Sequence, residues 1–189
     1  DVRYAKNENI ELLDDTSMIC DEDTLVIADN KKILAMAGIM GGMTSAVSES
    51  TNDILLESAW FNPRVIAGKA RKYGKHTDSS HRFERGVDPK LQLIAIERAT
   101  SLILEICGGV AGPVSEIISQ EDLPKTKKIE LNYEAVSKQL GIKLDSREID
   151  EILHRLGLKK EKNSHWKIPS WRFDLEIQQD LIEEIARII

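Results

Sequence analysis

Cysteine and aromatic residues are scarce in this sequence, and long apolar runs are absent from it. The 189 residues include 2 cysteines, and aromatic residues make up 5%. Cys20 and Cys107 stand far apart without the spacing of metal ligands, and the histidines are scattered, so we expect no zinc site. Both cysteines are expected to be buried thiols in a reducing compartment. Without a membrane-spanning run or a signal-peptide pattern, the sequence predicts a cytoplasmic protein that makes no membrane contact.

The charge balance is acidic. Lysine and arginine number 26 against 32 aspartates and glutamates, a formal net charge of −6, so the surface as a whole does not favour nucleic acid. Any RNA contact would need a local basic patch. With 41% hydrophobic and 31% charged residues, the chain is typical of a globular protein with one large or two small domains. It begins at Asp1 and stops at Ile189 inside a helical pattern, so we expect a piece of a longer protein.

Residues 1 to about 60 carry strand and turn signals, and helical signals follow. Asn62 followed by Pro63 is an N-cap and first-turn pair, and Gly74 closes the run that they start. Apolar residues at three- and four-residue spacing then continue up to Gly108. We predict strands over residues 24–28, 33–37 and 54–59, and helices over residues 64–73 and 91–106.

A polar stretch between Ile118 and Lys128, which contains Pro124, predicts a domain boundary. The residues beyond it predict two helices and a hairpin, which together indicate a winged-helix-like or helix–turn–helix-like unit. The elements are a strand over 129–131, a helix over 133–140, a second helix from Asp145 to Gly157, and hairpin arms over 158–160 and 166–168. The fold class is therefore α+β, with a mixed strand and helix domain over 1–120 and the small domain over 125–189.

Two short segments of the first domain could carry chemistry. Residues 37–46 (AGIMGGMTSA) are glycine-rich, so they form either a phosphate-binding loop or a turn between two strands. The turn is favoured, because no Gly-Lys-Ser/Thr follows and the Rossmann spacing is absent. Glu57 stands in the apolar run ILLESAWF, where an unpaired buried carboxylate is costly. It therefore meets a partner or ligand, faces out from the strand, or pairs with an arginine.

The segment 69–88 concentrates positive charge in an acidic protein, and we predict a helix end and a loop there. This density makes it the best candidate for contacts with RNA phosphates, unless its arginines simply form a salt-bridged loop with Glu84. His76 and His81 do not define a Ser/His triad, since no nucleophile–base pair can be read from the sequence. The candidates for RNA contact are Arg71, Lys72, Lys75, His76, Arg82 and Arg85.

Acidic residues gather in the last predicted helix, within residues 170–188 (SWRFDLEIQQDLIEEIARI). Three of them stand at i, i+3 and i+4, so that two or three share one helix face, and a fourth precedes the helix. Such a cluster is either a Mg²⁺ site, since Mg²⁺ prefers oxygen ligands, or a solvated acidic face. The candidate ligands are Asp174, Asp180, Glu183 and Glu184.

Taken together, these segments resemble the phenylalanyl-tRNA synthetase beta subunit family in their order and spacing. The strings are AGIMGG, DILLESAWFNP, ARKYGKHTDSSHRFERGVDP, AIERATSLILEICGG and IPSWRFDLEIQQDLIEEIARI, and the likeness runs over essentially the whole chain. It implies that residues 1–120 are the C-terminal part of a tRNA-editing domain, which in this family hydrolyses tyrosine wrongly attached to the phenylalanine tRNA. It also implies that residues 125–189 are the small domain that follows, running into a catalytic-like core that packs on the alpha subunit.

The resemblance assigns roles in the editing pocket. Glu57 would read the tyrosine hydroxyl, Thr77 and Ser79 match positions that line the pocket, and Ala37 and Gly41 match its floor. An apolar synthetic pocket rejects an added hydroxyl only modestly, whereas a second pocket that hydrogen-bonds it discriminates strongly. Hydrolysis would rest on the positioning of water and the tRNA end. Because further pocket residues of the family precede this piece, the isolated chain is expected to have little or no editing activity.

By the same resemblance, the four carboxylates match the acidic set to which the family assigns Mg²⁺. The parent enzyme uses ATP and Mg²⁺ to join phenylalanine to its tRNA, with synthesis on the alpha subunit, in a heterotetramer of two alpha and two beta subunits. Two rival interpretations are a structural and RNA-docking scaffold without its own chemistry, and a stand-alone editing hydrolase. The second domain and the core-like helix argue against the hydrolase.

Overall fold

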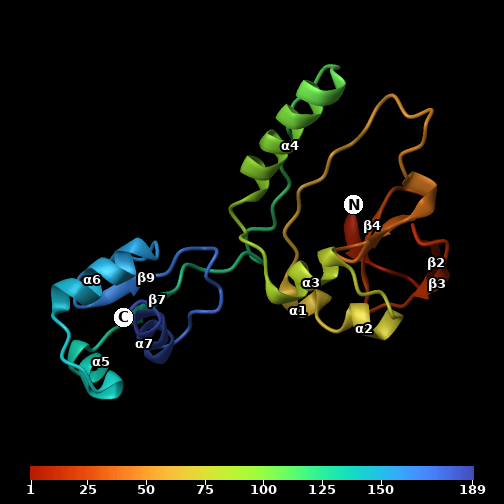
Figure 1. Cartoon of the computed structure of the whole chain (residues 1–189). Helices are drawn as coiled ribbons and strands as arrows, with labels where there is room; N and C mark the ends of the chain where they lie inside the picture. Colours follow the sequence, from red (N-terminus) through yellow and green to blue (C-terminus); the bar gives the residue numbers. More distant parts are fainter. The chain divides into compact units, whose positions relative to one another are not determined.

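The computed structural model describes all 189 residues and divides them into two compact units, Asp1–Asp122 and Leu123–Ile189. Figure 1 shows the course of the chain through both. Each unit combines helices with short antiparallel strands, which confirms the predicted α+β class. None of the helices has the length and apolar character that crossing a membrane requires.

Six short strands in the first unit form two small sheets. The strands are β1 (Val2–Tyr4), β2 (Glu8–Glu11), β3 (Ser17–Cys20), β4 (Leu25–Ala28), β5 (Ile33–Met36) and β6 (Met40–Gly41). The larger sheet has the order β1-β4-β5-β6, and β2 pairs with β3. Alternate apolar residues such as Val26 and Met36 are buried with Phe61 and Ile66 in one core. The strands predicted over 24–28 and 33–37 are thus confirmed.

Helical segments follow the sheets in the first unit. They are η1 (Met43–Ser45), α1 (Pro63–Ile66), α2 (Lys69–Tyr73), α3 (Asp78–Arg85) and α4 (Gln92–Cys107). The side chain of Asn62 caps α1, and Gly74 ends α2 in the left-handed conformation, as the sequence predicted. The single helix predicted over 64–73 is wrong, because Gly68 at φ +78° divides it into two. The long helix predicted over 91–106 is confirmed as α4.

Two burial predictions for the first unit are wrong. Residues 54–59 form no strand, and Leu55 is 98% exposed, because the sheet offers this run no neighbouring strand to accept its backbone hydrogen bonds. Helix α4 buries none of its residues, so Cys107 near its end is exposed. Cys20 is buried as predicted, and burial raises the pKa of its thiol to about 11.

The second unit contains two helices, a hairpin and a third helix. Its elements are β7 (Lys128–Glu130), α5 (Tyr133–Leu140), α6 (Ser146–Arg155), β8 (Lys159–Lys160), β9 (His165–Lys167) and α7 (Gln178–Ala186). The strands form an antiparallel sheet of order β7-β9-β8, and the fully buried Trp166 lies in the core with Leu153 and Leu181. The order of helix, helix and hairpin is the one that the sequence predicted.

Local signals set the element boundaries of the second unit. The Asn132 side chain accepts from two backbone N–H groups of α5, and Asp145 accepts from the backbone of α6. Gly141 and Gly157 follow the helices at φ +71° and +87°, where glycine is favoured. At Gly157 space is short as well, because an added Cβ would lie 2.8 Å from the ring of Trp171.

Candidate functional site

Two distant parts of the first unit meet at the start of α3. Thr77 is the N-cap residue: its Oγ1 accepts from the backbone N–H of Ser80 at 3.0 Å and donates to the carbonyl of Ile39 at 2.7 Å. The Ser80 hydroxyl accepts from the Thr77 backbone N–H at 3.0 Å, which completes a capping box. A single threonine hydroxyl thereby fixes α3 to the β5–β6 turn. The loop predicted within residues 69–88 is wrong for Asp78–Arg85, since this capping box starts a helix there.

The β5–β6 turn is packed closely against α3. Gly38 has φ +68°, and a Cβ added there would lie 3.1 Å from the ring of Phe83 and 3.3 Å from that of Phe61. These two rings lie 5.1 Å apart between centroids. Ala37 is buried, and a Cβ on Gly41 would come within 3.1 Å of a leucine side chain. A side chain at Gly38 or Gly41 would therefore have to displace the neighbouring phenylalanine or leucine side chains.

Four of the five predicted pocket residues lie in this region. Thr77 contacts the turn that contains Ala37 and Gly41, and Ser79 is half-buried in the first turn of α3. Glu57 lies in a segment without regular structure, where its carboxyl makes no hydrogen bond or ion pair. Although Glu57 is exposed overall, the surrounding protein desolvates the carboxyl and raises its pKa. The pocket assignment itself stays a prediction.

A cavity of about 330 Å³ opens beside the capping box, within the size range of small-ligand sites. The Ser80 hydroxyl is engaged in the capping box, and Nδ1 of His81 lies 2.9 Å from an Arg85 nitrogen. No hydroxyl–imidazole pair is therefore assembled for nucleophilic attack. The cavity can position water by hydrogen bonds from the residues that line it, which are His76, Thr77, Asp78, Ser80, His81 and Glu84.

Two of the six residues predicted to contact RNA pair with carboxylates that are distant in the sequence. Lys75 is only 9% exposed, and its Nζ lies 2.5 Å from Asp14. Lys72 pairs with Asp21 and, at 2.9 Å, with Asp23. The hydrogen bond from Lys75 holds the pKa of the Asp14 carboxyl at about 2. These ion pairs attach α2, and Lys75 two residues beyond it, to the β2–β3 and β3–β4 turns.

The other four predicted RNA contacts are exposed. Arg85 pairs with Glu84 at 2.8 Å, as the salt-bridge alternative predicted, although the two lie on a helix rather than in a loop. Arg71, His76 and Arg82 have no side-chain partner and remain available for an external anion. Their contact with RNA stays a prediction.

Thr77→Val is expected to destabilise the first unit by about 1–2 kcal/mol, because α3 loses its N-cap acceptor and the Ile39 carbonyl loses its donor. Valine keeps the branched shape of threonine, so packing changes little. Hydrogen–deuterium exchange of the backbone amides of the first unit measures the loss, separately from the second unit. Thr77→Ser keeps the hydroxyl and should stay within about 0.5 kcal/mol of the unsubstituted protein. Equal losses in the two variants would contradict the capping role.

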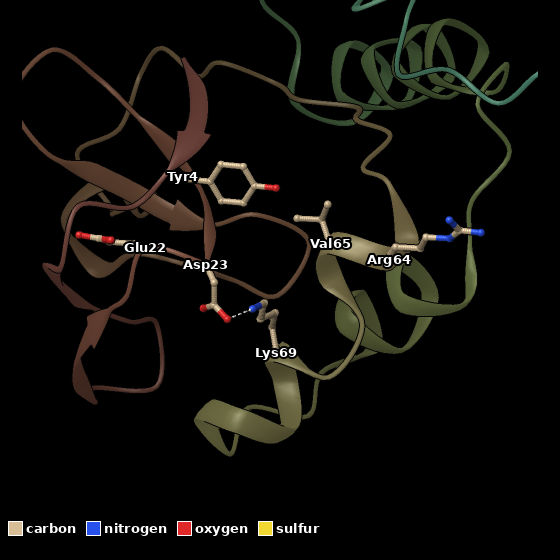
Figure 2. Close-up of a pocket in the computed structure, with 6 residues that line it drawn as sticks. All are labelled: Tyr4, Glu22, Asp23, Arg64, Val65 and Lys69. Atoms are coloured by element: carbon tan, nitrogen blue, oxygen red, sulfur yellow. Dashed lines mark ion pairs between the residues drawn. The ribbon is translucent and has the colours of Figure 1, made fainter.

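A second cavity, of about 410 Å³, lies between the end of β1 and helices α1 and α2 (Figure 2). Lys69 pairs with Asp23 at 2.5 Å across it, whereas the side chains of Tyr4 and Arg64 are exposed and have no partner. No sequence motif joins its residues, which come from three separate stretches, so only the fold brings them together. The lining residues are Tyr4, Glu22, Asp23, Arg64, Val65 and Lys69.

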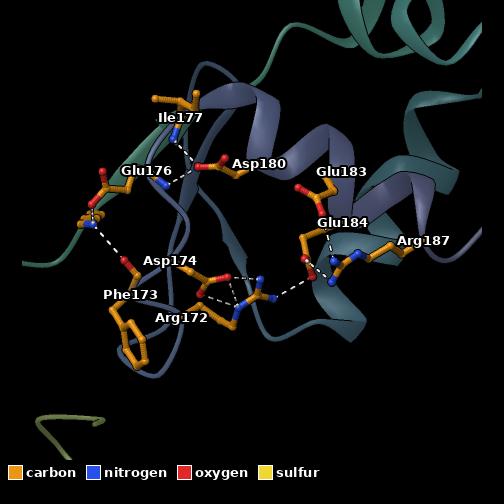
Figure 3. A network of polar contacts seen from close by, with 10 residues as sticks. Arg172, Phe173, Asp174, Glu176, Ile177, Asp180, Glu183, Glu184 and Arg187 are labelled. Atoms are coloured by element: carbon orange, nitrogen blue, oxygen red, sulfur yellow. Dashed lines mark hydrogen bonds and ion pairs between the residues drawn. The ribbon is translucent and has the colours of Figure 1, made fainter. Parts of the chain in front are cut away.

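In the second unit, an arginine lies between two carboxylates of the predicted metal site (Figure 3). Arg172 donates from Nε and Nη2 to Asp174 at 2.9 and 2.7 Å, and from Nη1 to Glu184 at 2.7 Å. The Arg172 guanidinium lowers the pKa of the Asp174 and Glu184 carboxyls below their usual range. The two carboxylates in turn raise the pKa of Arg172. Glu184 is buried, so this guanidinium supplies the positive charge that it needs.

The other two predicted ligands also have partners within the chain. Asp180 accepts from the backbone N–H groups of Glu176 and Ile177 at 2.7 and 2.9 Å, and Glu183 pairs with Arg187 at 3.0 Å. No three His, Cys, Asp or Glu side chains converge where a metal ion could sit. Since Mg²⁺ needs several oxygen ligands in near-octahedral geometry, the carboxylates as arranged here do not fit it. Their role as metal ligands stays a prediction.

Comparison with known proteins accounts for both units. Residues 1–108 match the family described as B3/4 domain, and residues 129–189 match the family described as tRNA synthetase B5 domain. The phenylalanine–tRNA ligase beta subunit of Idiomarina loihiensis is 55% identical over 192 residues, and that of Yersinia pestis is 53% identical over 191 residues. The first alignment covers 100% of this chain and the second 99%. Each covers 24% of the relative, so the chain spans about a quarter of the length of the curated relatives it matches. The chain belongs to the phenylalanine–tRNA ligase beta subunit family.

Proposed function

We propose that this chain contributes to the hydrolytic editing of tyrosine mischarged on phenylalanine tRNA, as part of a phenylalanine–tRNA ligase beta subunit. The observation that carries the proposal is the hydrogen bond between Thr77 and Ile39. It brings α3 and the turn over residues 37–41 to one place, in a chain that is 55% identical to such a subunit along its whole length. In this proposal residues 1–120 belong to the editing domain and residues 125–189 to the small domain and the start of the core.

The proposed pocket discriminates by a single hydroxyl. Glu57 has no partner within the chain, so its carboxylate is free to accept a hydrogen bond from the phenol of tyrosine. Partial desolvation of the carboxylate strengthens such a hydrogen bond. It also raises the free-energy cost of leaving the carboxylate without a donor. A phenylalanyl ester would leave Glu57 unpaired, so the pocket favours the tyrosyl ester.

The hydrolytic step needs a positioned water molecule. Water adds to the ester carbonyl, the bond between that carbon and the ribose oxygen breaks, and a proton passes to this oxygen, which leaves tyrosine and free tRNA. The cavity beside Thr77 offers imidazole and carboxylate groups to hold the water. The backbone N–H groups at the start of α3 favour negative charge, such as that of an oxyanion.

Contacts with the tRNA and the alpha subunit complete the proposal. The side chains of Arg71, His76 and Arg82 are exposed and have no side-chain partner within the chain, and in this proposal they meet tRNA phosphates. In the second unit, Trp171 and Phe173 expose 54% and 42% of their surface just before α7. Exposed aromatic side chains of this kind suit a protein partner, which would be the alpha subunit.

In this proposal the whole enzyme acts in the cytoplasm as a heterotetramer of two alpha and two beta subunits. It joins phenylalanine to its tRNA with ATP and Mg²⁺ on the alpha subunit. The carboxylates of the second unit are bound to arginines and backbone N–H groups, so no step of editing is assigned to a metal ion on this chain.

Deacylation by the full-length alpha–beta enzyme tests the proposed function. Tyrosyl-tRNA is expected to be hydrolysed at least about 100-fold faster than phenylalanyl-tRNA, because only tyrosine pairs with the pocket. The isolated chain should show little of this activity. The second candidate, a scaffold that only docks tRNA, is favoured by the absence of a hydroxyl–imidazole pair and predicts equal, uncatalysed rates for the two esters.

A further inference from the structure

Helix α4 has an apolar face that the rest of the chain does not bury. None of its 16 residues is buried, and Ile106 is 78% exposed. Glu97, Ser101 and Glu105 follow one another at four-residue spacing and form a polar side. Apolar residues recur at three- and four-residue spacing on the opposite side. This apolar face comprises Ile96, Ala99, Leu102, Ile103 and Ile106.

No local feature of α4 replaces the stabilisation that burial of this face would give. Leu91 at the N-cap makes no side-chain hydrogen bond, the first turn has no acidic residue, and the last turn has no basic residue. A helix of this length is marginal in water by itself, and helices in proteins are held mainly by packing of their apolar face. Helix α4 therefore depends on a partner that covers this face.

Two extended runs of the first unit lack partners as well. Residues 54–59 and 110–118 belong to no strand, and their backbones make no hydrogen bond with another backbone group. Leu55 is 98% exposed and Ile117 is 100% exposed. Apolar runs of this kind suit β-strands, which form only beside another strand. The partner that fits the first unit therefore covers a helix and also pairs with strands, as a segment of the same domain does.

The beta subunit itself offers such segments, because this chain spans only 24% of the length of each relative. A segment that precedes Asp1 enters the first unit directly at β1, which is an edge strand of its sheet. A segment that follows Ile189 is separated from the first unit by the second unit, which has a core of its own. Consecutive elements of a chain usually lie adjacent in space. We propose that the apolar face of α4 is the docking surface for the segment of the beta subunit that precedes Asp1.

Docking on α4 would also position Glu57. In the first turn of α4, Gln92 donates from Nε2 to the carbonyl of Ala59 at 3.3 Å and to that of Asp88 at 2.9 Å. Ala59 follows Glu57 by two residues, in the run that pairs with no strand. A helix that is held by its partner therefore holds the end of this run and, with it, the Glu57 carboxylate. The role of Glu57 rests on the proposed function, whereas docking on α4 does not.

Photo-cross-linking in the full-length alpha–beta enzyme tests the docking. With benzoylphenylalanine in place of Ile106, irradiation is expected to join α4 to residues that precede Asp1 in the same beta chain, as mapped by mass spectrometry of the cross-linked peptides. Benzoylphenylalanine in place of Ser101, on the polar side, is the matched control and should give no such cross-link. A cross-link from position 106 to any other part of the enzyme, such as the alpha subunit or a second beta chain, or no cross-link at all, would overturn the proposal.

Substitutions in the full-length enzyme test the two roles of α4 separately. Ile106→Asp places a charge on the apolar face and should speed hydrogen exchange of the α4 backbone amides at least about tenfold. Ser101→Asp adds the same charge to the polar side and should leave exchange unchanged, so equal exchange in the two variants would contradict the docking. Gln92→Ala keeps the apolar face but removes the hydrogen bond to Ala59. It should slow tyrosyl-tRNA hydrolysis at least about fivefold while the cross-link from position 106 persists.

The outcomes separate the docking from the proposed function. Normal hydrolysis of tyrosyl-tRNA without the expected cross-link would remove the docking alone. The expected cross-link in an enzyme that does not hydrolyse tyrosyl-tRNA would remove the proposed function and leave the face of α4 assigned. Normal hydrolysis by Gln92→Ala would show that α4 does not position Glu57.

Discussion

Glu57→Ala is expected to slow hydrolysis of tyrosyl-tRNA by the full-length alpha–beta enzyme at least about 100-fold, while the rate of phenylalanine charging stays unchanged. The Glu57 carboxyl has no hydrogen-bond or ion-pair partner within the chain, and desolvation by the surrounding protein raises its pKa. A substrate phenol would therefore replace water at this oxygen rather than compete with a protein donor. Deacylation of preformed tyrosyl-tRNA under single-turnover conditions measures the step directly.

Glu57→Gln and Asp53→Ala are the matched controls for this prediction. Glutamine keeps an acceptor oxygen but loses the charge, so its rate should fall between those of the unsubstituted enzyme and Glu57→Ala. Asp53 is an exposed carboxylate in the same irregular segment, and removing it should leave the rate unchanged. If Glu57→Ala hydrolyses tyrosyl-tRNA at the normal rate, Glu57 does not read the hydroxyl.

The second unit could be predicted from its sequence because its signals are local. The caps at Asn132 and Asp145, the glycines after each helix, and the polar turn before Trp166 each act within a few residues. Every predicted element of this unit is therefore present at nearly the predicted bounds. The register of its hairpin follows from Asn163, whose positive φ suits a tight turn.

The first unit was predicted less well because its determinants are distant or ambiguous. Helix α3 depends on a capping box closed by Ser80, a residue that also favours loops, within a highly charged stretch. The run over residues 54–59 has strand composition, yet a strand forms only where another strand pairs with it. Gly68 could equally have been tolerated inside a helix, and only its left-handed backbone shows the break.

The candidate sites show the same division between local and distant determinants. The resemblance placed Thr77 near residues 37–41, but the hydrogen bond that joins it to Ile39 could not be read from sequence. The spacing of carboxylates near α7 predicted a candidate metal site. That spacing does not show that the fold places Arg172 between Asp174 and Glu184. The cavity beside Tyr4 has no sequence signal at all, since its lining depends on how three stretches pack.

Arg172→Ala is expected to destabilise the second unit by about 3 kcal/mol at pH 7, because it leaves the buried carboxylate of Glu184 without its main partner. Urea unfolding measures this loss in a Trp60→Phe background, where the fluorescence comes from Trp166 and Trp171 in the second unit alone. Arg187→Ala is the matched control. Arg187 also approaches Glu184, at 3.8 Å, but it is 68% exposed, so its loss should cost less than about 1 kcal/mol.

The pH dependence separates this ion pair from simple packing of the arginine side chain. Arg172 lowers the pKa of Asp174 and Glu184 in the folded state, so its stabilisation is fully present above their unfolded pKa of about 4 and is lost as pH falls through the lower folded values. In Arg172→Ala, protonation of Glu184 removes the uncompensated buried charge. The difference in free energy of unfolding between the two proteins should therefore shrink as the pH falls below about 4. If the difference stays constant with pH, Arg172 stabilises the unit through the packing of its apolar stem. The positive charge of Arg172 would then not be needed to stabilise the Glu184 carboxylate.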